Sequence, residues 1–180
     1  MFARLSVLLV CTSMAACAYI QHVDTAQVPP GFFGLPVDND IGAINQASWA
    51  LASPGRTRGD PVEALRSAVA VEYLAGELNT APRWWAMSPI TKMLMLQARG
   101  EMRATLGIKP DTPAQAVVNA EITALWALEH GDVTGAQQAL SRPIFTQPPQ
   151  QIMQVLNNLP TLPAARVATS DAELQEFRHG

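Results

Sequence analysis

Four charged side chains in the central part of the chain could take part in chemistry, and all four lie on stretches with helical spacing. Lys92, Arg99 and Arg103 fall within about 40° of one another at 100° per residue, so they form one basic stripe. Glu121 falls inside an apolar arc of the next predicted helix. A carboxylate in that place must be paired, protonated or at the rim of the core.

We expect Glu121 to form a structural ion pair with Arg99 or Arg103, which could reach it if the two helices pack antiparallel. A rim position and a functional carboxylate are the alternatives. One isolated Glu without a second acid, a histidine or a metal cluster is weak support for an enzyme. For the basic stripe we favour the interpretation that its three side chains are solvated. Contact with acidic neighbours, and docking on anionic lipid or on a partner, are the other interpretations.

Two adjacent tryptophans, Trp84 and Trp85, lie in the joint between two predicted helices. If exposed, they would form a platform for a ligand or for lipid, because indole suits places where one end is apolar and the other wet. The interpretation we favour is that both rings plug the end of the helical body. Together with Lys92 they form the candidate binding surface.

Motifs of known chemistry are missing from the sequence, which has no phosphate-binding loop, nucleophile elbow or zinc-binding pattern. The acidic run Asp38-Asn39-Asp40 lacks the spacing of an EF-hand, and we interpret it as helix capping by Asp40 or Asn39. His130 stands at a predicted helix end, where the helix dipole favours it. We therefore expect no catalytic residue, no metal site and no cofactor, and we lean against an enzyme.

Helix-start signals of one type recur along the chain. Asp60-Pro61, Ser88-Pro89 and Thr112-Pro113 each place a side-chain acceptor just before a proline. Gly107 and Gly131 mark helix ends, and no stretch alternates with the period of two that a strand needs. The predicted fold class is all-α, an irregular helical bundle or a stack of helical hairpins behind a Pro/Gly-rich N-terminal tether. The predicted helices span 41–53, 61–79, 89–106, 113–130, 132–141, 149–158 and 170–178.

The composition supports one globular domain. The chain has 180 residues, of which 48% are hydrophobic and only 15% charged, against a usual ~25% charged. Neither a disordered chain nor a highly charged nucleic-acid binder fits these values. The net charge of −3 also argues against a polyanionic partner such as nucleic acid.

The first sixteen residues are typical of a secretory signal. Arg4 precedes an apolar run of roughly ten residues, too short to span a bilayer, which needs ~20. The run ends in Met14-Ala15-Ala16-Cys17, which resembles the lipobox of bacterial lipoproteins, although Leu is commoner than Met at its first position. The resemblance implies that Cys17 carries diacylglycerol on sulfur and becomes the acylated first residue of the mature protein. The alternative is ordinary signal cleavage after Ala18, which would leave a soluble chain starting at Tyr19.

Cysteine usage fits this interpretation. The only other cysteine, Cys11, lies in the signal run, so the mature chain has no pair of thiols for a disulfide. Where lipoprotein sorting follows the residue after the modified cysteine, Ala18 implies the outer membrane, facing the periplasm. The expected organisation is a signal peptide at 1–16, a lipid anchor and tether at 17–39, a helical domain at 40–160, and a tail with a short helix at 161–180.

The function we expect is that of a lipid-anchored helical envelope protein, a non-catalytic scaffold or accessory subunit. Its partners would be the membrane, through the N-terminal lipid, and an envelope protein. The runner-up is a periplasmic module that binds a small ligand or lipid, with Met93, Met95, Met102 and the two tryptophans lining an apolar groove. The third is an envelope hydrolase acting through acidic residues.

Overall fold

The computed structural model describes residues 23–34 and 38–179. The predicted signal peptide, the lipobox and Cys17 lie outside these ranges. No helix within them combines the length and the apolar character needed to cross a membrane.

The predicted all-α fold is confirmed. The described residues form seven α-helices, two short 3₁₀ turns and no strand, apart from one isolated bridge between Ile108 and Phe145. Six helices begin and end within two residues of their predicted limits, whereas the last begins at Pro163, seven residues earlier than expected. The helices are α1 (Asn39–Leu51), α2 (Pro61–Thr80), α3 (Pro89–Leu106), α4 (Ala114–Glu129), α5 (Val133–Leu140), α6 (Pro149–Asn157) and α7 (Pro163–His179), and the 3₁₀ turns are η1 (Pro54–Arg56) and η2 (Pro82–Trp84).

The local signals act as capping chemistry predicts at most helix ends. The side chain of Asp60 accepts a hydrogen bond from Glu63 N at 3.0 Å, and that of Ser88 accepts one from Ile90 N at 3.2 Å. Gly107 ends α3 with a φ of 67°, in the left-handed region that favours glycine. At α1 the capping residue is Asp38, not Asp40 or Asn39, because Asp40 is turned into the core.

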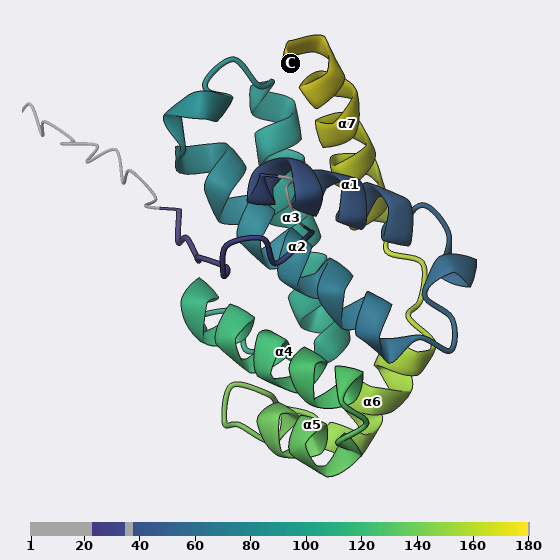
Figure 1. The fold of residues 1–180 in the computed structure, drawn as a ribbon. Coiled ribbons are helices and arrows are strands. Elements are labelled where there is room, and N and C mark those ends of the chain that lie inside the picture. Colours follow the sequence, from purple (N-terminus) through teal and green to yellow (C-terminus); the bar gives the residue numbers. More distant parts are fainter. Residues whose placement is uncertain (1–22, 35–37, 180) are drawn as a thin grey trace, which may run out of the picture.

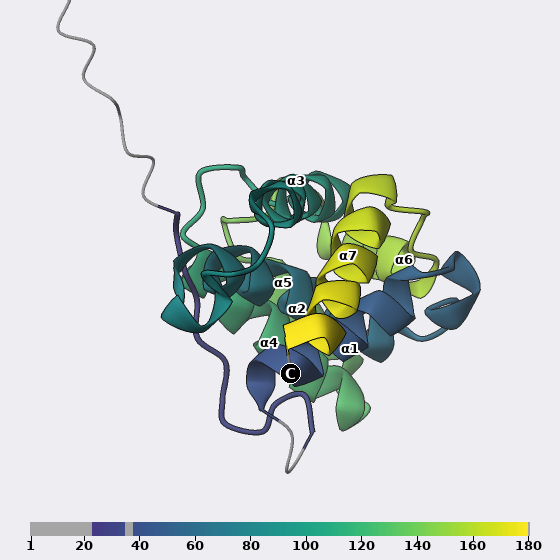
Figure 2. The same ribbon diagram turned by 90° about the horizontal axis from the view of Figure 1, so that it is seen from above.

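Helix α2 is the centre of the molecule. It packs against α1, α3 and α4, while α7 closes a ring of four helices by packing against both α1 and α3 (Figures 1 and 2). The antiparallel pair α4 and α5 covers another side of α2, and α6 packs against α2 and α5. Buried leucines and many buried alanines fill the interior, and the small side chains let the helices approach closely.

The residues from Val23 to Gly34 form an N-terminal strap that lies against the helical body. Ala26 is buried in a small apolar cluster with Val69 of α2 and Ile122 of α4. The strap and α4 also exchange two hydrogen bonds between the backbone of Gln27 and the side-chain amide of Gln115, at 2.8 and 3.1 Å. This part of the predicted tether is therefore docked on the body.

Candidate functional site

A buried ion network joins α2 to α3. The guanidinium group of Arg103 binds the carboxylate of Glu72 with two hydrogen bonds, from Nε at 2.9 Å and from Nη2 at 2.6 Å. Its Nη1 donates to the carbonyl oxygen of Pro110 at 2.8 Å. This fork-to-fork geometry is the strongest form of an ion pair between side chains, and here both partners are buried.

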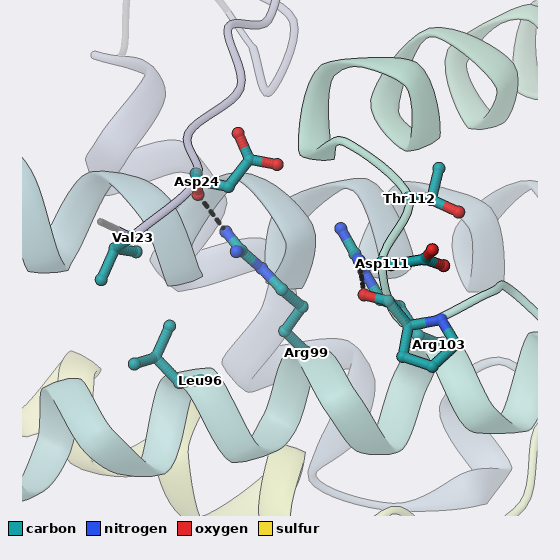
Figure 3. A pocket seen from close by; sticks show the side chains of 8 residues that line it. Val23, Asp24, Leu96, Arg99, Arg103, Asp111 and Thr112 are labelled. Carbon is teal, nitrogen blue, oxygen red and sulfur yellow. Dashed lines mark hydrogen bonds between the residues drawn. The ribbon is translucent and has the colours of Figure 1, made fainter. Parts of the chain in front are cut away.

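Arg99 extends the network to the N-terminal strap. Its Nη2 donates to the carbonyl oxygen of Asp24 at 3.0 Å (Figure 3). The same atom donates to the carbonyl oxygen of Glu72 at 3.0 Å, and Nε lies 3.3 Å from the Glu72 carboxylate. The side chain of Asp24 in turn accepts from the backbone N–H of Ala114, the first residue of α4. One short segment of chain thereby connects α2, α3 and α4.

Next to this network lies a pocket of about 380 Å³. Arg99 and Arg103 point into it from α3, facing the strap on one side and the loop before α4 on the other (Figure 3). The pocket is lined by Val23, Asp24, Leu96, Arg99, Arg103, Pro110, Asp111 and Thr112.

The structure contradicts two of the predictions, the solvation of the basic stripe and the acidic partner of its arginines. Arg99 and Arg103 are not solvated but buried, and their acidic partner is Glu72 instead of Glu121. The reason is the order of the helices, because α2 lies between α3 and α4 and takes the place that the prediction gave to α4. Lys92, the third member of the stripe, is half-buried and takes no part in the network.

Glu121 is buried, as one of the predicted alternatives required, but no arginine pairs with it. Its side chain is 1% exposed, and its Oε2 atom has no hydrogen-bond partner. Burial raises the pKa of Glu121 well above its usual value, the charge of Glu72 raises it further, and the charge of Arg103 opposes both. The surroundings of Glu121 therefore favour its neutral, protonated form over the carboxylate.

The pKa values of the two arginines shift in opposite directions, although the same carboxylate acts to raise both. Burial lowers the pKa of Arg99, although the charge of Glu72 opposes this. Burial also acts to lower the pKa of Arg103, but its hydrogen bonds to Glu72 and the carboxylate charge outweigh burial and raise the pKa overall. Arg103 is therefore the principal partner of Glu72, and both arginines stay cationic at neutral pH.

A second polar cluster lies around Asp40 at the start of α1. Its carboxylate accepts hydrogen bonds from the Tyr73 hydroxyl and, at 2.9 Å, from Nε1 of Trp84. The guanidinium of Arg83 lies 3.5 Å from Asp40 and 2.8 Å from Asp38. Burial raises the pKa of Tyr73 far above its usual value, and the hydrogen bond to Asp40 adds to this, so the phenol remains a donor. The cluster fastens α1, α2 and η2 together.

The tryptophan pair is divided between core and surface. Trp84 is 6% exposed and plugs the body as predicted, but Trp85 is 76% exposed, so the interpretation of both rings as a plug is wrong for the second. The methionines of α3 are divided in the same way, since Met95 and Met102 are buried in the core and Met93 is exposed. These side chains therefore do not line one common groove.

Sequence reasoning missed Glu72 and Asp24. A helical wheel would have placed Glu72 on the buried face of α2, because its neighbours one turn away are the buried residues Ala68, Val69, Ala75 and Gly76. No local pattern could have predicted the role of Asp24, because its hydrogen-bond partner Ala114 lies 90 residues further along the chain. His130, in contrast, ends α4 as expected, with its Nδ1 2.7 Å from the carbonyl oxygen of Trp126.

In chemical terms, the charged groups of these clusters hold elements together. Within the described ranges, no group of three or more His, Cys, Asp or Glu side chains is placed to hold a metal ion. Comparisons with protein-family models, with curated proteins and with solved structures found no match to this chain.

Proposed function

We propose that this chain is a lipid-anchored, non-catalytic helical protein of the bacterial envelope that acts as a scaffold or accessory subunit. The observation that carries the proposal is the sequence Met14-Ala15-Ala16-Cys17 at the end of a signal-like segment. Cys17 would carry the lipid, and Ala18 favours the outer membrane, with the body facing the periplasm. A soluble periplasmic or secreted protein is the alternative location.

The helical body supports the scaffold role through what its charged groups do. Glu72, Arg99 and Arg103 connect α2, α3 and the strap, and Asp40 connects α1, α2 and η2. An active site needs charged groups that are free to meet a substrate. Apart from Nε of Arg99, which has no hydrogen-bond partner, these groups direct their hydrogen bonds to the protein itself, which fits a rigid body that presents surfaces to a partner.

The anchor is tested by the mass of the mature N-terminus. The full chain would be produced in a bacterial host, extracted from membranes with detergent and analysed by mass spectrometry, beside the variants Cys17→Ser and Cys11→Ser. We expect the parent and Cys11→Ser to carry a diacylglyceryl group on Cys17, and Cys17→Ser to remain an uncleaved precursor. An unmodified chain that begins at Tyr19 would overturn the anchor.

The scaffold role is tested by cross-linking in intact cells. A photoreactive residue would replace Trp126 or Trp49, two half-exposed side chains on different helices. We expect one envelope protein to be captured from one of these positions in an amount comparable with the chain itself. If no adduct forms at these two positions or at other exposed positions on the body, the scaffold role is contradicted.

A ligand-binding module is the second candidate, and the pocket beside Arg99 and Arg103 favours it. The two arginines, the carboxylates of Asp24 and Asp111 and the apolar Leu96 line the pocket together, which suits a small molecule that combines an anionic group, a hydrogen-bond donor and an apolar part. Such a ligand would raise the melting temperature of the parent chain. A screen of amphiphilic carboxylates and phosphates that leaves the melting temperature unchanged would dismiss this candidate.

A further inference from the structure

The outer side of α3 has an unusual composition for a surface helix. All six of its exposed residues are uncharged, namely Pro89, Ile90, Met93, Gln97, Gly100 and Ala104. Ile90 is 64% exposed and Met93 is 51% exposed. Helices on the surface of soluble proteins normally place charged residues on the side that faces water. This uncharged face is therefore a candidate surface for contact with a partner or with lipid.

The chain enters the body beside the same helix. Val23, the first described residue, lines the pocket together with Leu96 of α3, and Arg99 fixes the carbonyl of Asp24 (Figure 3). Leu96 is one helical turn from both Met93 and Gly100, two members of the uncharged face. The point of entry thus lies on the flank of that face.

The length of chain before this point limits how far the body can lie from the membrane. Only six residue steps separate Cys17 from Val23. Whatever their conformation, they span at most roughly 20 Å, about two helix diameters. A lipid on Cys17 would therefore keep the flank of α3 close to the bilayer, while helices on the other side of α2 lie further away.

The distribution of charge favours the same orientation. Lys92 lies on α3 next to the uncharged face, and Trp85 is exposed just before the helix begins. Lysine and tryptophan are the side chains that suit the headgroup region of a bilayer. Helices α4 and α5 contain no lysine or arginine, and the charged residues exposed at the turn between them, Glu129 and Asp132, are acidic. These helices lie on the side of α2 away from α3, where they offer anionic lipid no basic side chain.

We propose that the uncharged face of α3 lies on the membrane surface, with Trp85, Ile90 and Met93 in the headgroup region. The inference rests on the proposed lipid anchor at Cys17. The lipid would supply the attachment, and α3 would fix the orientation, so that α4 and α5 point toward the periplasm for a partner. A lipid anchor and a weak surface contact joined by a short link reinforce each other in this way.

The test is a depth measurement with two matched labels. Met93→Cys on α3 and Val133→Cys on α5 replace side chains that are each 51% exposed, so both labels begin with the same access to water. Each full-length variant would carry a polarity-sensitive fluorophore on the new cysteine, since lipid blocks Cys17. The lipidated proteins would be placed in vesicles of phosphatidylethanolamine and phosphatidylglycerol that contain lipids with a quencher in the headgroup region.

We expect the label at position 93 to be quenched several-fold more than the label at position 133, and to lose its access to a water-soluble quencher. Equal weak quenching at both positions, in protein whose mass shows lipid on Cys17, would overturn the orientation and leave the anchor intact. Protection from water without quenching by lipid, or disulfide dimers through position 93, would show a protein on this face and would also overturn it. An unmodified Cys17 would overturn the anchor and the inference together.

Discussion

At the scale of single residues, the carboxylate of Glu72 supplies the negative charge that two buried guanidinium groups need. Arg103 binds it through two hydrogen bonds, and the Nε of Arg99 lies 3.3 Å from it. A buried charge without a counter-charge is costly, so the network is stable only while all its members are present. The cost of a substitution therefore depends on which charge it leaves without a partner.

We predict that Glu72→Ala lowers the free energy of unfolding by about 3–5 kcal/mol, because it leaves two arginines buried without a carboxylate. The control is Glu63→Ala on the same helix, whose ion pair with Arg66 is partly exposed and is worth at most about 1 kcal/mol. Urea denaturation of both variants gives the comparison. Similar midpoints for the two would show that water reaches Arg99 and Arg103.

Glu121 provides a prediction about pH. Its pKa is raised in the folded chain, so the folded state holds a proton that the unfolded state releases above its usual pKa of 4.5. The stability that this proton contributes is complete below that value and is lost as the pH rises toward the raised pKa. In Glu121→Gln the side chain stays neutral at every pH. We expect the variant to gain stability relative to the parent as the pH rises above 4.5, which melting temperatures across a pH series would show.

The acidic partner of Arg99 and Arg103 could not be predicted from the sequence, although their position on one side of α3 could. The spacing of Arg99 and Arg103 correctly placed them on one side of α3. Which helix meets that side depends on packing between elements that are distant along the chain, and a helical wheel has no information on it. Glu72 and Glu121 both lie on buried faces, and the order of the helices decides between them.

At the scale of elements, most helix boundaries could be predicted from the sequence, because a cap depends on residues that are close to the helix end along the chain. Asp60 and Ser88 sit beside the N–H groups that they bind, and Gly107 takes the left-handed conformation at its own position. The start of α4 was predicted to within one residue from Thr112-Pro113, but its cap was not, because Thr112 does not cap the helix. Pro113 offers no side-chain cap there, and Asp24 of the strap supplies the missing acceptor from a distant part of the sequence.

Gly76 shows how closely the strap approaches α2. A Cβ atom at this position would lie 2.8 Å from the Cα of Thr25 and 3.0 Å from the carbonyl oxygen of Asp24. Both are backbone atoms, so the strap itself would have to shift. The glycine is therefore explained by the passage of the strap over the helix, since glycine is otherwise unfavourable inside a helix.

We predict opposite signs for alanine at two helical glycines. Gly100→Ala on α3 places its Cβ in open space, and it should stabilise the chain by up to about 1 kcal/mol through helix propensity. Gly76→Ala has the same gain in propensity but displaces the strap, so it should destabilise the chain and expose residues near Thr25 to proteases. Thermal melting and limited proteolysis of the two variants test this. Stabilisation by both would mean that the strap does not lie over Gly76.

At the scale of the whole molecule, the strap is an integral part of the fold rather than a link to it. It covers the apolar cluster that contains Val69, Val118 and Ile122. Phe32 and Phe33 pack against the core from the outside, the second of them against Gly42 of α1. Both aromatic residues lie in a Pro/Gly-rich stretch, and such a composition does not determine where on the body the chain packs.

We predict that a chain beginning at Asp38 remains helical but is less stable than one beginning at Val23. The shorter chain loses the cap of α4, worth about 0.5–2 kcal/mol, and the burial of Ala26 and two phenylalanines, worth about 1–2 kcal/mol for each aromatic ring in a half-buried position. Arg99 also loses one of its acceptors.

The two chains would be compared by circular dichroism and by urea denaturation. The helix content should be nearly the same, because all seven helices lie after residue 38, while the unfolding free energy should fall by about 3–6 kcal/mol. Since small domains have only about 5–15 kcal/mol in total, such a loss would bring the body close to unfolding at physiological temperature. A chain beginning at Asp38 with the same midpoint as the longer one would show that the strap rests on a body that is already complete.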